Sequence, residues 1–169
     1  MGADQLGIAL TLPLARPQRS PHQVRERFVQ FSRGIVAGLA RLGVSAAFGG
    51  KNDIEARGKK VAGLGIYHDA SGGLLFHASI LVDLDIALMM GALKTSFEKI
   101  SDKAIATVAQ RVTTARREAG QPLTLARARA AMAEGYAEQC DATLTPSDFA
   151  PSERVGIAQL EREKYATLE

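Results

Sequence analysis

The most constraining stretch of the chain is GGKNDIEARGKKVAGLGIYHD, residues 49–69, because turn-forming and strand-forming residues alternate within it. Glycine and the Asn52–Asp53 pair favour turns, since glycine tolerates unusual backbone angles and short polar side chains bond to their own backbone. The run KKVAGLGIYH has the small and β-branched residues that are typical of a strand. We therefore predict a strand, a turn and a second strand in this stretch.

The residues around this stretch predict the rest of a sheet. The apolar run 6–12 stops at Pro13, which predicts one buried strand followed by a loop. Apolar runs separated by short turn sequences predict four successive strands at 44–48, 53–56, 59–68 and 73–82. Because strands joined by tight turns run in opposite directions, the pattern indicates an antiparallel meander.

Helical spacing of apolar residues appears once before the meander and repeatedly after it. The segment from Pro21 to Gly43 predicts a long helix, with Ser20 as its N-cap and Gly43 as its stop. Further helical segments are predicted at 86–94, 101–118, 124–139 and 151–169. This order of elements predicts one α+β domain over residues 1–169, with helices packed on a mostly antiparallel sheet.

Composition excludes several classes of protein. A chain of 169 residues that is 46% hydrophobic can build one domain with a real core. The net charge of +3 is too small to predict a nucleic-acid partner. The single cysteine, Cys140, excludes an internal disulfide and a multi-cysteine metal site. No apolar run approaches the roughly 18 residues of a spanning helix, and no signal pattern opens the chain. We expect a soluble cytoplasmic protein without a membrane partner.

Three motifs in the centre of the chain resemble those of lipoate-protein ligases, in the biotin/lipoate ligase superfamily. The family's pattern runs Gly-Arg-Asn-Asp, then Gly-(Arg/Lys)-Lys-(Val/Ile)-(Ser/Ala)-Gly, then His-Gly-(Thr/Ser). The matching residues here are Asn52-Asp53, Gly58-Lys59-Lys60-Val61-Ala62-Gly63 and His77-Ala78-Ser79. Weaker similarity continues through KISDKAIATVAQRVTT to EKYATLE. The resemblance implies the fold of the class II biotin/lipoate ligases.

The resemblance implies that Lys60 is the functional lysine, which reaches the carbonyl oxygen and phosphate of an acyl-adenylate. An ammonium group is a suitable point charge for a phosphate and for a developing oxyanion. Adjacent lysines on an exposed strand are otherwise usually solvated. Strand alternation places Lys60 with Ala62 and Leu64 on the ligand face and turns Lys59 to the opposite face.

The resemblance also places other motif residues at the substrate and adenylate. Asn52 and Asp53 would lie near the phosphate and its Mg²⁺, which prefers oxygen ligands. The alternative is a turn pair whose side chains cap the backbone. The implied binding residues are Asn52, Asp53, Gly58, Val61, Ala62, Gly63, His77, Ala78 and Ser79.

His77 has two interpretations. The resemblance places it close to the acyl or adenylate pocket, whereas a histidine inside an apolar strand is more often a core residue with a satisfied hydrogen bond. We assign it no acid–base role.

Two departures from the family's pattern affect the expected substrate pocket. Ala78 stands where the family has glycine, which would narrow the pocket by one methyl group. GLGIY replaces the more usual Gly-Ser-Ala-Gln, so the polar contact of that glutamine is absent.

The position of cysteine bears on the type of reaction. Related octanoyl and lipoyl transferases use a cysteine nucleophile just before the strand that precedes the Gly-Lys-Lys motif. The corresponding SAAFGGKND has none, and Cys140 lies on a predicted helix end. This favours a route through an activated adenylate over a covalent acyl-enzyme.

The family's upstream Arg-Arg-x-x-Gly-Gly-Gly-x-Val-x-His segment has no match, so the chain resembles the C-terminal half of a catalytic domain that is incomplete without a partner half. We expect a subunit of a split lipoate-protein ligase, paired with a separate N-terminal-half polypeptide that bears the glycine-rich motif. It would use ATP and Mg²⁺ to activate lipoate as lipoyl-AMP and transfer it to a lysine of a lipoyl-domain or glycine-cleavage-H-like carrier. The alternatives are an octanoyl or lipoyl transferase, and a non-catalytic module that binds a lipoyl-carrier protein or a small acid.

Overall fold

The computed structural model describes residues 4–13, 21–69, 72–85, 88–89 and 110–166. The strands are β1 Gln5–Pro13, β2 Ala47–Gly50, β3 Asp53–Ala56, β4 Lys59–His68 and β5 Gly73–Leu81. The helices are α1 Pro21–Arg41, α4 Ala115–Ala119, α5 Leu125–Cys140 and α6 Pro151–Leu160, with a π-helix η2 at Glu161–Tyr165. The predicted segment 86–94 lies outside the described residues except at 88 and 89, and 101–118 is described only from 110 onward.

Every neighbouring pair of strands is antiparallel, in the order β1-β5-β4-β3-β2. β2 to β5 therefore form the predicted meander, and β1 adds to it beside β5. Arg57 and Gly58 make the two-residue turn between β3 and β4, with φ of +50° and +71°. Such turns fit the twist of a hairpin because both of their residues adopt the left-handed region. The predicted α+β architecture is confirmed.

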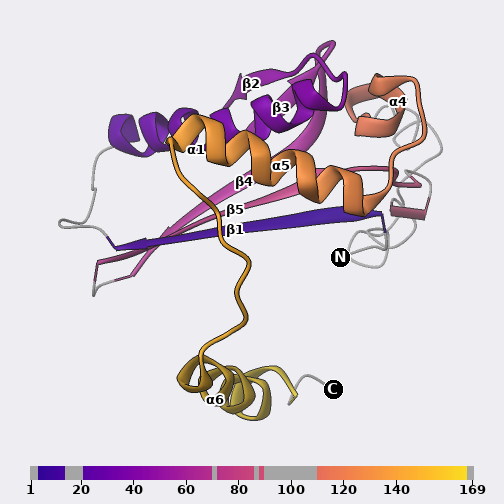
Figure 1. Cartoon of the computed structure of the whole chain (residues 1–169). Helices are drawn as coiled ribbons and strands as arrows, with labels where there is room; N and C mark the ends of the chain where they lie inside the picture. The colour runs from indigo at the N-terminus through magenta and orange to yellow at the C-terminus, as the bar shows by residue number, and fades with distance from the viewer. Residues whose placement is uncertain (1–3, 14–20, 70–71, 86–87, 90–109, 167–169) are drawn as a thin grey trace, which may run out of the picture.

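Two helices, α1 and α5, lie side by side over one face of the sheet (Figure 1). Alternate strand residues point toward them, because successive side chains of a strand face opposite sides. Ile80 of β5 pairs with Leu6 of β1 on one side and with Ala62 of β4 on the other, and Ile80 and Ala62 are buried. Ile35 and Leu39 of α1 are fully buried as well. The core therefore lies between the helices and this one face.

Glycines let α1 and α5 approach each other closely. A Cβ atom at Gly135 would lie 2.3 Å from the backbone oxygen of Gly34, so only glycine fits there. Tyr136 packs against Gly34, and its hydroxyl donates a hydrogen bond of 3.0 Å to the Phe31 carbonyl oxygen. Burial, and secondarily the nearby Cys140, raises the pKa of Tyr136 above its ordinary value. The helical layer is thus fixed by backbone proximity and one buried hydroxyl.

β2 differs from the strand predicted at 44–48, because the glycine pair that indicated a turn belongs to the strand. At Gly49 a Cβ would lie 2.4 Å from the Glu55 carboxyl carbon, so that side chain uses the room beside the glycine. The turn follows instead at Lys51, with φ of +48°. Val44 is buried but precedes the strand.

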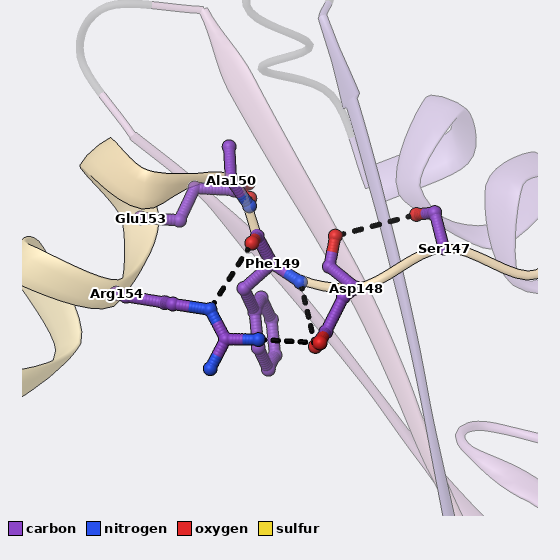
Figure 2. Close-up of polar contacts among 6 residues, drawn as sticks. All are labelled: Ser147, Asp148, Phe149, Ala150, Glu153 and Arg154. Atoms are coloured by element: carbon purple, nitrogen blue, oxygen red, sulfur yellow. Dashed lines mark hydrogen bonds and ion pairs between the residues drawn. The ribbon is translucent and has the colours of Figure 1, made fainter.

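α6 stands apart from the rest of the described fold, at the end of the extended residues 142–150 (Figure 1). Figure 2 shows how the N-terminus of α6 is capped. The Glu153 carboxylate accepts a hydrogen bond of 2.7 Å from the Ala150 amide, and Arg154 pairs with Asp148 and donates to the Phe149 carbonyl. These bonds satisfy groups that a helix end otherwise leaves without partners. None of the described helices has the length and apolarity that crossing a bilayer requires.

Candidate active site

The face of the sheet opposite α1 and α5 carries the small and polar residues of the sequence motifs. Its register joins Asp53 to Gly63, Gly63 to Ser79 and Ser79 to Gly7, so one row of neighbours crosses four strands. Gly7 is exposed, and the other three residues are half-buried. We call this surface the open face and define it by Gly7, Ala9, Thr11, Asp53, Lys60, Gly63, Gly65, Tyr67, Leu75, His77 and Ser79.

A β-bulge at Val61 brings Lys60 to the open face. The register between β3 and β4 shifts by one residue there, so Val61 is the extra residue of β4. Val61 and Ala62 are both fully buried, and Lys60 shares its face with Gly63. The prediction that grouped Lys60 with Ala62 and Leu64 is therefore wrong, because it assumed an uninterrupted two-residue period.

Lys60 forms an ion pair with Asp53 on this face. Its Nζ lies 2.6 Å from Asp53 Oδ1, and the two side chains are 38% and 31% exposed. The end of the lysine passes over Gly63, where an added Cβ would lie 3.2 Å from both Cε and Nζ. An ammonium group has three donor hydrogens, so one carboxylate leaves donors for an incoming oxygen. The arrangement can therefore hold a phosphate or carbonyl oxygen directly above the strand.

Asn52 anchors the start of β3 to β4. Its side-chain nitrogen donates to the Leu64 carbonyl at 3.2 Å, and its backbone oxygen accepts from the Leu64 amide at 2.8 Å. This geometry agrees with the alternative that Asn52 caps the backbone. Its role toward a phosphate or metal stays a prediction.

The described residues fit Mg²⁺ only in one way. They contain no group of three or more His, Cys, Asp or Glu that could hold a metal by itself. Asp53 is one carboxylate beside an ammonium group. Mg²⁺ commonly binds one or two carboxylates while keeping waters and substrate phosphates as its other ligands. Asp53 therefore fits a Mg²⁺ ion that arrives with a phosphate, and an all-protein metal cage is not formed by the described residues.

His77 lies on the open face and is exposed, so its interpretation as a core histidine is wrong. It stands between Gly65 of β4 and Ala9 of β1 in the second row of neighbours. The ring leans over β4, since its Nε2 lies only 2.1 Å from the point where a Cβ on Gly65 would be. Gly65, which the sequence interpretation did not include, thus makes room for the imidazole.

The remaining motif residues do not reach this surface. Ala78 is 3% exposed and pairs with Ile8 and Leu64 on the helix-covered side. Its methyl group therefore cannot narrow a pocket on the open face, contrary to the prediction. Gly58 belongs to the β3–β4 turn, where its φ of +71° requires a flexible backbone.

A carboxylate that sequence reasoning missed supports the Lys60 end of β4. The Glu118 side chain is 8% exposed, accepts a 2.7 Å hydrogen bond from the Thr113 hydroxyl and lies 3.4 Å from Arg57 Nε. The Thr113 amide in turn donates to the Lys60 carbonyl at 2.9 Å. These contacts tie the segment before α5 to the hairpin that carries Lys60. No local sequence signal could reveal the two contacts with the hairpin, because Arg57 and Lys60 are far along the chain from Glu118 and Thr113.

Cys140 is exposed at the end of α5. That helix lies over the face of the sheet opposite the open face (Figure 1). The thiol is therefore far from the open face.

Comparison with known proteins gives the family. Residues 1–137 match the Lipoyl protein ligase A/B catalytic domain. The chain belongs to this family. The resemblance inferred from the central motifs is confirmed at this level.

Among curated members of the family, the chain is 29% identical to the octanoyltransferase LipM of Symbiobacterium thermophilum, over 89% of this chain and 62% of that protein. It is 34% identical to the lipoate-protein ligase LplJ of Bacillus subtilis, over 50% of this chain and 25% of that protein. The chain thus spans less than two thirds of the length of these relatives. Both transferases and ligases stand among its relatives.

Solved structures confirm the fold of the class II biotin/lipoate ligases. The bi-partite lipoate protein ligase of Thermoplasma acidophilum superimposes with a TM-score of 0.85 at 22% identity, over 99% of this chain and 63% of that one. A lipoate-protein ligase A bound with ATP gives 0.77 at 20% identity, over 97% and 63%. The biotin protein ligase of Aquifex aeolicus gives 0.52 at 13% identity, over 82% and 53%.

Proposed function

We propose that this chain supplies the lysine-bearing face of a ligase that attaches lipoate, or its eight-carbon analogue octanoate, to a lysine of a lipoyl-type carrier domain. The observation that carries the proposal is the Lys60–Asp53 pair lying over Gly63 on the open face. A fixed positive charge above bare backbone is suited to an acyl-adenylate, whose phosphate and carbonyl oxygens need stabilisation.

The reaction has two steps. In the first, the carboxylate of the acid attacks the α-phosphate of ATP, pyrophosphate leaves and an acyl-AMP forms. In the second, the amine of the carrier lysine attacks the acyl carbonyl, an amide bond forms, AMP leaves and the amine loses a proton to solvent. Mg²⁺ would neutralise phosphate charge, with Asp53 as the residue that fits it. The acceptor amine is the nucleophile, so the chain need not supply one.

In both steps the role of Lys60 is electrostatic. Its ammonium stabilises negative charge on the phosphate in the first step and on the carbonyl oxygen in the second. Asp53 fixes the direction of the ammonium at 2.6 Å, and Gly63 leaves the strand surface low enough for the substrate to reach it. Such preorganised charge acts most strongly where water is excluded.

A cover for the open face would exclude that water. The face presents exposed Gly7, Ala9 and His77. We propose that a polypeptide carrying the family's glycine-rich segment packs here and completes the site, as a separate chain. In support, one solved structure of the family is described as a bi-partite lipoate protein ligase.

A second candidate function is octanoyl transfer from an acylated carrier without ATP, because several curated relatives are octanoyltransferases. That route needs a nucleophile for a covalent acyl-enzyme. The cysteine that the resemblance expects near β2 is absent from residues 45–53, and Cys140 is on the other layer. The ligase route needs no such group, so we favour it.

The deciding experiment is mass spectrometry of a lipoyl-domain acceptor incubated with this chain and a polypeptide bearing the glycine-rich half. One reaction contains lipoate or octanoate with ATP and Mg²⁺, and a second contains an octanoylated carrier without ATP. We expect the acyl mass gain only in the first, and little gain when this chain is used alone. A gain only in the second would establish the transferase, and a gain in neither would refute both.

A further inference from the structure

The backbone of Lys60 is held from both sides, although β5 does not reach it. On one side Lys60 pairs with β3. On the other side the register of β4 and β5 would place Val82 opposite Lys60, but β5 ends one residue earlier. Val112 forms an isolated parallel bridge to Lys60 there, and the Thr113 amide donates to the Lys60 carbonyl at 2.9 Å. These two residues therefore take the place that β5 leaves beside the lysine.

Glu118 fixes Thr113 in this place through one carboxylate oxygen and contacts the hairpin turn through the other. Oε1 accepts the 2.7 Å hydrogen bond from the Thr113 hydroxyl, and Oε2 lies 3.4 Å from Arg57 Nε. Thr113 is fully buried, and the Glu118 side chain is 8% exposed. A buried polar group that loses its partner bears the cost of desolvation, so this hydrogen bond is held in one geometry.

The short helix α4 gives Glu118 a fixed support. The Arg116 amide donates to the Val82 carbonyl at 2.9 Å, which joins α4 to the end of the meander. Thr114 caps the start of the helix by accepting a hydrogen bond of 3.2 Å from the Arg117 amide. Ala115, the first residue of α4, is fully buried. Glu118 therefore extends from an element that is itself attached to the sheet.

The two ends of Lys60 are thus restrained by different groups. Asp53 holds Nζ at 2.6 Å, whereas the contact between Glu118 and Thr113 holds the main chain from which the lysine extends. Because the lysine side chain is long, a small rotation of its main chain displaces the ammonium group. A displacement of about 1 Å can cost on the order of 10²-fold in rate, since a preorganised charge acts where negative charge develops.

We propose that Glu118 is a positioning residue, which acts through Thr113 to keep the Lys60 ammonium where it stabilises the acyl-adenylate. The inference rests on the proposed acyl-ligase function. It extends the site from the residues of the open face to α4.

Four substitutions separate the hydrogen bond from the rest of the side chain. Glu118→Ala removes both contacts, and we expect single-turnover transfer from preformed acyl-AMP to fall about ten- to hundredfold in the reconstituted pair. Glu118→Gln keeps an oxygen that accepts from the Thr113 hydroxyl, so it should lose much less. Thr113→Val removes the hydroxyl and should lower the rate as Glu118→Ala does, whereas Thr113→Ser keeps the hydroxyl and should retain the rate.

Glu134→Ala is the matched control. The Glu134 side chain is 65% exposed and pairs with Arg41 in the helical layer, so this variant also loses a carboxylate and an ion pair. We expect its transfer rate to equal that of the wild type.

A double-mutant cycle with Lys60→Ala distinguishes positioning from a general loss of structure. If Glu118 acts only through the lysine, Glu118→Ala causes no further loss of rate in the Lys60→Ala background. If Glu118→Ala instead weakens the whole fold, the two losses multiply.

Hydrogen exchange of the full chain without substrate tests the geometry independently of the reaction. NMR follows the Thr113 amide, with the Ala128 amide of α5 as the reference, since it donates to the Thr124 carbonyl at 2.9 Å. In Glu118→Ala we expect the Thr113 amide to exchange about tenfold faster and the Ala128 amide to keep its wild-type rate. Equal acceleration of the two amides would show a global loss of stability and overturn the positioning role.

The outcomes separate this inference from the proposed function. Transfer by the wild type that Glu118→Ala and Thr113→Val leave unchanged overturns the positioning role and leaves the ligase intact. Losses that multiply with that of Lys60→Ala overturn the positioning role as well. No transfer of lipoate or octanoate by the wild type overturns the proposed function, and the positioning role in that reaction is overturned with it, whatever the exchange rates show.

Discussion

Replacing Lys60 with alanine removes the charge that the proposed reaction depends on. The ammonium is held 2.6 Å from Asp53 and directly above Gly63, where an adenylate oxygen would lie. Loss of one preorganised electrostatic group at a site of developing charge costs about 10²- to 10³-fold in rate, or about 3–4 kcal/mol. We expect a loss of this size in single-turnover transfer from preformed acyl-AMP to the acceptor, using the reconstituted pair.

Lys59→Ala is the matched control for this substitution. Lys59 pairs with Ala56 at the start of β4, on the side of the strand away from Lys60 and Glu55. Removing it should change the rate little. Equal losses in the two variants, or a larger one for Lys59, would refute the assignment of the open face as the ligand face.

Fold stability separates a chemical role of Lys60 from a structural one. The Lys60–Asp53 pair is about one third exposed on both sides, so solvent screens it. Exposed pairs contribute about 0–1 kcal/mol to stability. The denaturation midpoint of Lys60→Ala should therefore stay close to that of the wild type. A fall of several kcal/mol in the free energy of unfolding would attribute the lost activity to misfolding.

Three further substitutions test the scaffold and the alternative chemistry. Gly135→Ala places a Cβ 2.3 Å from the Gly34 backbone oxygen and should lower the free energy of unfolding by about 1–3 kcal/mol or more. Gly156→Ala is the control, because the space around Gly156 is open, and it should leave the free energy of unfolding unchanged. Chemical denaturation of both variants measures the difference. The pKa of Tyr136 is raised in the folded state, so the contribution of Tyr136 to the free energy of unfolding is complete below a pH of about 10 and declines above it. Tyr136→Phe should remove this decline when the free energy of unfolding is measured at a series of alkaline pH values. Cys140→Ser should leave the rate of acyl transfer to the acceptor unchanged. If mass spectrometry finds an acyl group attached to the wild-type chain but not to Cys140→Ser, Cys140 is instead a nucleophile.

Local sequence signals predicted the elements that local geometry controls. The bounds of β4 were predicted correctly as 59–68, because its turn residues and β-branched residues mark both ends. α1 also agrees, with Gly43 adopting φ of +81° just beyond the helix end. The motif match named Asp53, Lys60 and Gly63 as site residues, and the structure places all three on one face of the sheet, which strand alternation alone did not predict.

The rest of the site depends on contacts between distant segments. The bulge at Val61 arises from the pairing of β4 with β3, and it moved Lys60 to the face of Gly63. The position of the His77 ring depends on Gly65 of the neighbouring strand β4. Glu118, which follows the meander in the chain, contacts Arg57 of the β3–β4 turn. A period of two along one strand cannot show any of these contacts, because each needs the position of a neighbour.

The position of β1 at the edge of the sheet has a consequence for how the chain folds. Among the described strands its neighbour is β5, with Gln5 opposite Leu81, so β1 has no partner in the described sheet until the last strand of the meander has been synthesised. α1 has a similar delay, since its closest packing is with α5. Chains dominated by such long-range contacts fold slowly, and bacterial or eukaryotic synthesis proceeds at about 5–20 residues per second. The hairpins from β2 to β5 can form early from local contacts, while β1 and the helical layer join last, leaving an unpaired strand exposed for seconds during synthesis.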